Sequence, residues 1–366
     1  MIALPRRVSI VEEAITALSS GIANQTWINF LPSERHLAEQ LQISRPTLRL
    51  ALAQLSGDGL IKVEQGRATK ILKAPSTLSR HARAHTVAFV VMRPVTSLTG
   101  ISILRECQAA LQSAGYACEF HERPYAHSKK QIELLRDLIA ARNDVVWISV
   151  SAEPAHQKIF EEMGARAIIL GCAGEGITLP SVDVDYAAIA VHATKTFCRM
   201  GHRRIHAVLP QKPLAGDRIA ERAIVEAAQK PDFAHMTWTF SRADDTSDSV
   251  CRALARQLSS AQPPTGIYAT YGRHALTVLT YLSLMGRQVP RDISLLCRDD
   301  EESLQHVVPA IAAYKSDHQL EIRKIVRAVQ LLAGGRARQP RSVFFIPKFE
   351  PRGTIGRCAD GFRDHL

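Results

Sequence analysis

The feature that most restricts the fold of this chain is a regular alternation of strand-like and helical stretches, which begins at Thr86. Runs such as 87–92 and 145–150 are short and almost entirely apolar, as expected of strands buried on both faces of a parallel sheet. Apolar residues at helical spacing follow, for example over 100–114, which ends before Gly115. Strands and helices that alternate in this way build parallel sheets with helices on both faces.

The alternation occurs in two successive sets. The first predicts strands over 87–92, 116–120, 145–150 and 167–170, and helices over 100–114, 128–142 and 155–163. The second predicts strands over 205–209, 236–240, 266–270 and 293–296, and helices over 186–200, 215–229, 248–259 and 273–285. Two sets indicate two lobes with a cleft between them, and ligands of such sheets bind beyond the carboxyl ends of the strands.

A different pattern precedes this region and predicts three helices and a hairpin. The first helix covers about 9–19, and the second begins after Ser33, a residue whose hydroxyl caps helices well. The third begins at Ser44, and its apolar residues at i, i+3, i+4 and i+7 form one buried face: Leu48, Ala51, Leu52 and Leu55. Strand-like residues 60–63 and 69–72 flank a turn. This order is that of a winged helix-turn-helix.

The polar residues of this segment suit DNA. Arg45 and Arg49 share a side of the third helix away from its buried face, and Thr47 lies near its exposed start. Such a helix start enters the major groove, where Arg can bind guanine O6 and N7 with two hydrogen bonds. Gly66 would let the tip of the wing approach DNA closely, and Arg67 would reach the minor groove or a phosphate.

The same residues resemble the signature of the GntR family of bacterial regulators. The resemblance covers about 65 residues and rests on the runs L-P-S-E-R at 31–35, S-R-P-T-L-R at 44–49 and G-L-I at 59–61. It implies that five residues meet DNA: Arg35, Ser44, Arg45, Thr47 and Arg49. Wings of the family often read G-x-G-T, whereas Ala68 replaces the second glycine here.

Three parts of the chain are therefore predicted. Residues 1–74 form the DNA-binding domain, residues 75–85 a linker without apolar periodicity, and residues 86–366 the larger α/β domain. The larger domain resembles the LacI/GalR regulators and the periplasmic sugar-binding proteins over nearly the whole of 86–357. The resemblance rests on V-D-V-D at 182–185, M-G-H-R-R-I at 200–205 and G-R-Q-V-P-R-D-I-S-L at 286–295.

This second resemblance implies a sugar site with Arg218 at the start of a helix and Asp299 after a strand. Arg donates and Asp accepts, so the pair can clamp neighbouring hydroxyls. The family commonly carries Asn-Asp before the last helix of its second lobe, but residues 270–274 read T-Y-G-R-H. Tyr271 could stack on a sugar ring there. The departure leaves open whether the effector is an ordinary sugar, and whether one is bound at all.

Composition adds weaker constraints. The formal charge of +11 favours a polyanionic partner, although residues 1–74 account for a net of only +3. The seven cysteines form no C-x-x-C pair, which fits reduced thiols in the cytoplasm. The sequence predicts no membrane span, export signal, metal site or cofactor.

The sequence thus predicts a cytoplasmic, homodimeric transcription regulator that reads a near-palindromic double-stranded operator. We expect a repressor of a carbohydrate-related operon that responds to a sugar-like effector in the cleft. Alternatives are a regulator that has lost effector binding, a solute-binding protein, and a GntR-type protein with a pyridoxal-phosphate enzyme-like domain. The last needs a longer domain and a lysine for the Schiff base, which is not apparent.

Overall fold

The computed structural model describes residues 10–23, 27, 30–57, 60–63, 69–72, 86–95, 98–122, 129–142, 144–334 and 340–358. The chain divides into two compact units, Met1–Ala82 and Arg83–Leu366. The predicted linker, residues 75–85, lies outside the described residues.

The smaller unit is a winged helix-turn-helix. Its elements are α1 (Ile10–Ala23), α2 (Glu34–Gln40), α3 (Arg45–Gly57), β1 (Ile61–Lys62) and β2 (Lys70–Ile71). The four apolar residues predicted to form the inner face of α3 are buried, and they pack with Leu18, Leu37 and Ile61 into one core. The strands are antiparallel and shorter than predicted, and a bridge between Phe30 and Lys70 extends the ribbon.

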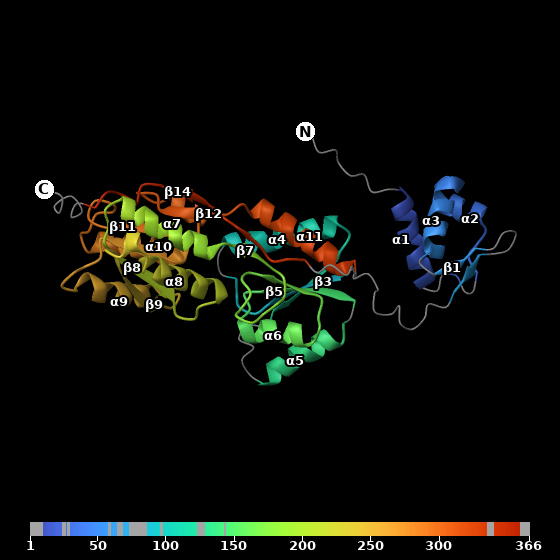
Figure 1. Ribbon diagram of the computed structural model, residues 1–366, viewed down its shortest axis with the longest axis horizontal. Helices are drawn as coiled ribbons and strands as arrows, with labels where there is room; N and C mark the ends of the chain where they lie inside the picture. Colours follow the sequence, from blue (N-terminus) through green and yellow to red (C-terminus); the bar gives the residue numbers. More distant parts are fainter. Residues whose placement is uncertain are drawn as a thin grey trace. The chain divides into compact units, whose positions relative to one another are not determined.

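The larger unit contains two lobes (Figure 1). The elements of the N-terminal lobe are β3 (Thr86–Val91), α4 (Leu98–Ser113), β4 (Ala117–Glu122), α5 (Lys129–Ala140), β5 (Val145–Val150), α6 (Pro154–Glu162), β6 (Ala167–Leu170), β7 (Ser181–Val184), α11 (His318–Ala333) and β13 (Val343–Phe345). The sheet is parallel throughout, in the order β13-β7-β6-β5-β3-β4.

The C-terminal lobe repeats the plan. Its elements are α7 (Tyr186–Arg199), β8 (Arg204–Pro210), α8 (Ala215–Ala228), β9 (Thr237–Ala243), α9 (Ser247–Leu258), β10 (Gly266–Ala269), α10 (Gly272–Leu284), β11 (Ser294–Cys297), β12 (Ala312–Lys315) and β14 (Lys348–Glu350), with short 3-10 helices at Pro231–Phe233 and Glu302–Gln305. The sheet order is β14-β12-β11-β10-β8-β9, and only its edge strand β14 is antiparallel among the described strands.

The period-two geometry of strands explains why the apolar runs are continuous. In β3, Val87 and Phe89 belong to the core under α4 and α11, whereas Ala88 and Val90 belong to the core under α5 and α6. Figure 1 shows the two helix pairs on opposite faces of this sheet. Both faces must therefore be apolar, and the predicted α/β class with two parallel-sheet lobes is confirmed.

The described chain passes between the lobes three times, after β7, after β12 and after β13. Two of these segments are joined by a hydrogen bond of 2.8 Å from the backbone N of Asp185 to the backbone O of Phe345. Each lobe is therefore built from separate stretches of sequence.

Among the described residues, no helix combines the length and apolar character needed to cross a membrane.

Candidate functional site

The first candidate site is the exposed start of α3 in the smaller unit. Ser33 caps α2 by accepting a hydrogen bond from the backbone N of His36 (3.3 Å). Gln42 then adopts a positive φ of 51°, which makes the turn into α3 tight. The Oγ of Ser44 accepts from the backbone N of Thr47 (3.3 Å) and lies 2.7 Å from the Thr47 hydroxyl. These bonds fix the first turn of the helix that would enter DNA.

The buried face of α3 forces its arginines outward. Because Leu48 is fully buried, Arg45 and Arg49 project from another side, with side chains 59% and 63% exposed. The carboxylate of Glu34 holds both: Arg49 Nε donates to it at 2.8 Å, and Arg45 Nη2 lies 3.9 Å away. Arg35 is also exposed and donates to Glu39 (3.1 Å). Exposed pairs of this kind contribute at most about 1 kcal/mol, so a phosphate can displace them.

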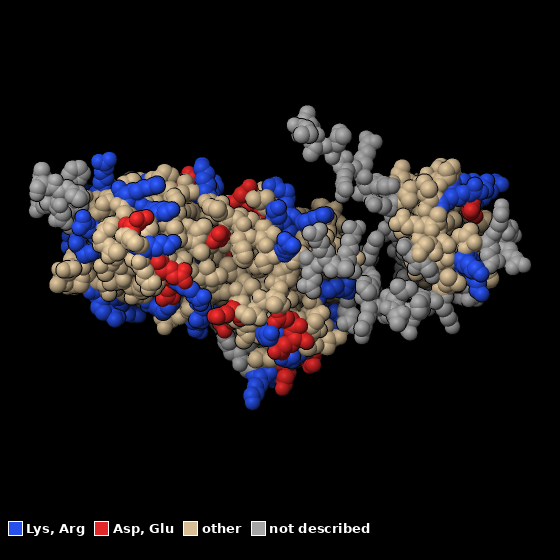
Figure 2. All heavy atoms as spheres, viewed as in Figure 1, with Lys and Arg blue, Asp and Glu red and all other residues tan. Residues whose placement is uncertain are grey.

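The stem of the wing adds two cations that the sequence analysis did not single out. Lys62 and Lys70 are exposed and stand opposite each other in the β1–β2 register. Side chains of residues opposite each other in a ribbon project from the same face, so both ammonium groups lie on one side of the wing. In Figure 2, Lys and Arg side chains stand out on the surface of this unit with little acidic surface beside them. Gly66 and Arg67 lie outside the described residues.

The second candidate site is a cavity between the two lobes of the larger unit. Its inner part has a volume of about 310 Å³ and its outer part about 630 Å³. Asp183, on β7, and Tyr186, at the start of α7, line both parts from the two sides of the first passage between the lobes, and Tyr271 and Asp299 line both from the C-terminal lobe. The walls follow the carboxyl ends of the strands, where ligands bind in sheets of this kind.

Arg298 organises the C-terminal-lobe wall. It follows β11 directly, and its guanidinium donates to Asp217 (2.6 Å) and with two nitrogens to Asp299 (2.8 and 3.0 Å). Burial alone disfavours the charged guanidinium, but the carboxylates of Asp299 and Asp217 raise the pKa of Arg298 above its ordinary value. The guanidinium also lies over the ring of Tyr186, 4.4 Å from its centroid. All four side chains are therefore held in one arrangement.

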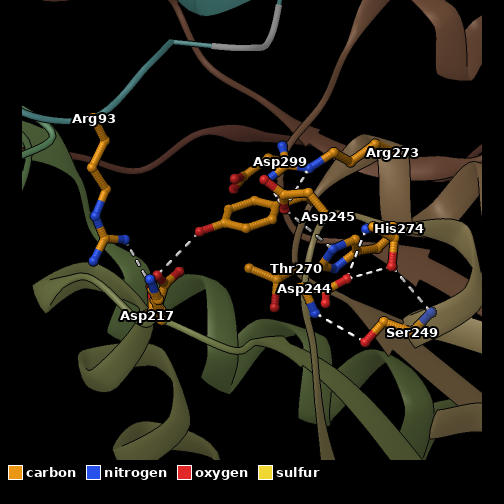
Figure 3. Close-up of polar contacts among 12 residues, drawn as sticks. Arg93, Asp217, Asp244, Asp245, Ser249, Thr270, Arg273, His274 and Asp299 are labelled. Carbon is orange, nitrogen blue, oxygen red and sulfur yellow. Dashed lines mark hydrogen bonds and ion pairs between the residues drawn. The ribbon is translucent and has the colours of Figure 1, made fainter. Parts of the chain in front are cut away.

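Asp217 is the centre of a second set of contacts. One of its oxygens accepts from the backbone N of Leu214 (2.8 Å), which caps α8, and from the hydroxyl of Tyr271 (3.2 Å). Figure 3 shows Asp217 and Asp299 among the polar side chains of this region, together with Arg93, which donates to the backbone O of Lys212 and to Glu153. Next to Asp217, a Cβ on Gly216 would lie 2.5 Å from the ring of Tyr186, so only glycine permits this packing.

The N-terminal-lobe wall contributes two further carboxylates. Asp183 ends in the cavity, and one of its oxygens accepts from the backbone N of Val184 (2.8 Å). Burial of its carboxyl, with the charge of Glu321 adding to the effect, raises the pKa of Asp183 to about 7. The Glu321 side chain is 11% exposed and lies on α11. The cavity therefore offers strong hydrogen-bond acceptors from both lobes.

The structure brings together two of the three residues predicted for an effector. Tyr271 and Asp299 both line the cavity, whereas Arg218 is exposed and does not line it. The residue before it, Asp217, takes the position in the wall. Sequence reasoning also missed Arg298, although an Arg between a four-residue buried strand and a pair of aspartates was a visible signal.

Models of two known protein families match part of each unit. The model of the bacterial regulatory proteins of the gntR family matches residues 29–71. The model of a periplasmic binding protein-like domain matches residues 194–355.

Similar proteins of known role are regulators. The HTH-type transcriptional regulator CelR of Thermobifida fusca is 26% identical over 204 residues, which are 54% of this chain and 58% of CelR. The chain thus spans less than two thirds of CelR. The arabinose metabolism transcriptional repressor of Geobacillus stearothermophilus is 22% identical over 307 residues, 81% of this chain and 82% of the repressor.

Solved structures show the same fold. A LacI family transcriptional regulator from Bifidobacterium animalis subsp. lactis has a TM-score of 0.66 at 20% identity and covers 76% of this chain and 100% of its own. A complex of the transcriptional regulator CelR with cellobiose has a TM-score of 0.65 at 20% identity and covers 95% and 100%. The chain therefore joins a helix-turn-helix domain of the gntR type to a periplasmic-binding-protein-like domain, the combination predicted from its sequence.

Proposed function

We propose that this chain is a transcription regulator that represses a carbohydrate-related operon and responds to a sugar-like ligand in the interlobe cavity. The observation that carries the proposal is the start of α3, where Glu34 holds Arg45 and Arg49 together on an exposed face. The regulators to which the chain is similar, one of arabinose metabolism and one in complex with cellobiose, support a carbohydrate role. Such a regulator acts on DNA in the cytoplasm.

DNA binding uses the start of α3 as the reading element. Its first turn enters the major groove, where Arg45 and Arg49 leave Glu34 to bind base edges or phosphates. Ser44 and Thr47 lie beside them and can donate hydroxyl hydrogen bonds to the DNA backbone. Two copies of the chain read two half-sites, so the operator is nearly palindromic.

Ligand control uses the two lobes. A ligand that contacts both walls of the cavity binds most tightly when the lobes are closed around it, and the three interlobe segments allow hinge motion. Such a ligand shifts the population of the larger unit and thereby the affinity for DNA. Tyr271 and Asp299 contact the ligand from one lobe in this proposal, and Asp183 from the other.

Two alternatives are less well supported. The match of residues 194–355 to a periplasmic binding protein-like domain favours a binding role over a pyridoxal-phosphate enzyme. The cavity, with polar side chains from both lobes facing about 310 Å³ of space, favours a regulator that binds an effector over one that has lost it.

The DNA-binding proposal is tested by fluorescence anisotropy with the DNA upstream of the gene that encodes the chain. We expect specific binding whose affinity falls steeply with salt, because phosphate contacts release counterions. Arg45→Ala and Arg49→Ala should each weaken it by roughly 1–3 kcal/mol. The matched control is Arg256→Ala, which removes an exposed arginine from the last turn of α9. Equal affinities for all four proteins would refute the assignment.

A further inference from the structure

The charged groups around the cavity are unequally distributed. Among the described residues that line it, carboxylates outnumber Lys and Arg by eight to four. The carboxylates are Asp183, Asp217, Asp244, Asp245, Asp299, Asp300, Glu301 and Glu321, and the cations are Arg93, Lys212, Arg273 and Arg298. In the inner part, Arg298 is the lining cation against four carboxylates. Asp300 is bound by Arg352, which lies outside the lining, so seven carboxylates remain against the four cations and the lining carries more acidic than basic side chains.

The arginines that line the cavity are already bound to carboxylates of the protein. Arg298 is shared by Asp217 and Asp299, as described above. Arg273 donates to Asp245 with two nitrogens (2.9 and 2.6 Å), and Arg93 pairs with Glu153 (2.5 Å). A phosphate or carboxylate on a ligand could recruit one of them only by leaving a protein carboxylate without its cation, at considerable cost.

Lys212 is the lining cation that remains. It is exposed and borders the outer part of the cavity but not the inner part. Among the described residues that line the inner part, Arg298 is therefore the cation.

In the N-terminal-lobe wall, Asp183 and Glu321 form no ion pair with an arginine among the described residues, and Arg298 acts on Asp183 only from the C-terminal-lobe wall. Asp183 and Glu321 both line the inner part, and their mutual repulsion contributes to the raised pKa of Asp183. The cation nearest to Glu321 in an ion pair is His318, at 3.6 Å, and it carries a charge only when protonated. A positive group placed between Asp183 and Glu321 would relieve this repulsion.

We propose that the ligand of this cavity is a small polyhydroxylated amine, such as an amino sugar, and that phosphorylated or acidic sugars are excluded. Hydroxyl groups supply donors to Asp217 and Asp299, and an ammonium group supplies three more donors and a charge to Asp183 and Glu321. The inference rests on the proposed function, because it names the class of ligand for the same cavity.

The test is isothermal titration calorimetry of the full chain, without DNA, against matched sugars. The panel consists of glucose, galactose and mannose, each as the neutral hexose, the 2-amino-2-deoxy hexose and the hexose 6-phosphate. For at least one skeleton we expect the amine to bind ten times or more as tightly as the neutral sugar, and the phosphate not to bind. A phosphate or neutral hexose that binds as tightly as its amine would overturn the inference while leaving a sugar-responsive regulator intact.

If none of the nine compounds binds, the inference fails together with the sugar part of the proposed function, and the anisotropy assay still decides DNA binding on its own.

Substitutions test which carboxylates bind the ammonium group of the ligand. Asp183→Asn and Glu321→Gln should each reduce the preference for amine over neutral sugar at least fivefold while the neutral sugar still binds. Glu226→Gln, on the exposed side of α8, is the matched control and should keep the preference. Two carboxylates are replaced separately so that a folding defect in one variant does not decide the result. A preference unchanged in both folded variants would refute the proposed location.

Discussion

Replacing Arg298 by methionine tests whether a buried charge network holds one wall of the cavity together. The Arg298 side chain is only 4% exposed, and its guanidinium makes one hydrogen bond to Asp217 and two to Asp299. Methionine keeps much of the length and apolar volume of the side chain, but it removes the charge and every donor. The two aspartates are then left facing each other without a cation.

The size of the effect follows from how deeply each partner is buried. The Asp299 side chain is 34% exposed, so water can solvate its charge, whereas that of Asp217 is 5% exposed. Removing one partner of a buried ion pair costs roughly 3–5 kcal/mol, because the other charge stays buried. We therefore expect the free energy of unfolding of the larger domain to fall by about 3–5 kcal/mol in Arg298→Met.

The double variant Arg298→Met/Asp217→Asn isolates the charge. Its amide oxygen can still accept from the backbone N of Leu214, while no buried charge is left at this position. We expect it to lose only about 1–2 kcal/mol, the scale of an ordinary hydrogen bond. The coupling between the two substitutions should then be about 2 kcal/mol or more.

Urea unfolding followed by tryptophan fluorescence is a suitable assay, because Trp147 and Trp238 both lie in the larger domain. Arg242→Met is the matched control: Arg242 also binds a carboxylate with two hydrogen bonds, but its side chain is 39% exposed. This control should lose less than about 1 kcal/mol. A loss below 1 kcal/mol in Arg298→Met, or a double variant no more stable than the single one, would refute the reasoning.

Three further predictions concern packing and protonation. Leu48→Ala removes a fully buried side chain of α3 and should destabilise the smaller domain by about 2–5 kcal/mol, measured as a lower melting temperature of that domain together with lost DNA binding. Gly216→Ala places a methyl group 2.5 Å from the ring of Tyr186 and should destabilise the larger domain by roughly 1–3 kcal/mol in urea, so unchanged stability would contradict the packing. Asp183 holds its proton more strongly when folded, because its pKa is raised to about 7, so wild-type stability should fall relative to Asp183→Asn between pH 4 and pH 7. Urea titrations at pH 4, 6 and 8 check this, and a difference that does not grow with pH would count against it.

The α/β class, both lobes and most of their early elements were predictable because their apolar patterns are long and regular. The predicted strand 145–150 and helix 215–229 differ from β5 and α8 by at most one residue at either end. After residue 297, helix α11 was not predicted although its buried Ile322, Ile325 and Val329 recur at helical spacing, whereas the strands carry little local signal. Strands β13 and β14 are three residues each, too short for a period to appear, and their partners lie far away in the sequence.

The cavity was less predictable than the fold. The family resemblance pointed to Arg218, but a helix turns about 100° per residue, so one position decides whether a side chain faces the cavity or solvent. Which one faces inward is set by Ala220 and Ala223, which α8 buries against its lobe. The role of Arg298 depends on Asp217, 81 residues earlier in the chain, and no local pattern contains that pairing.

Because the chain passes between the lobes three times, the first lobe cannot be completed until most of the second lobe has been synthesised. Helix α11 and strand β13 belong to the first lobe, yet the ribosome makes them only after nearly all of the second. Until then the apolar side of the first sheet lacks Ile322, Ile325 and Val329, which cover it in the finished protein. A nascent chain stopped before Val343 would therefore leave each sheet without one of its edge strands, β13 or β14, and would expose both sheets to aggregation and to cellular proteases.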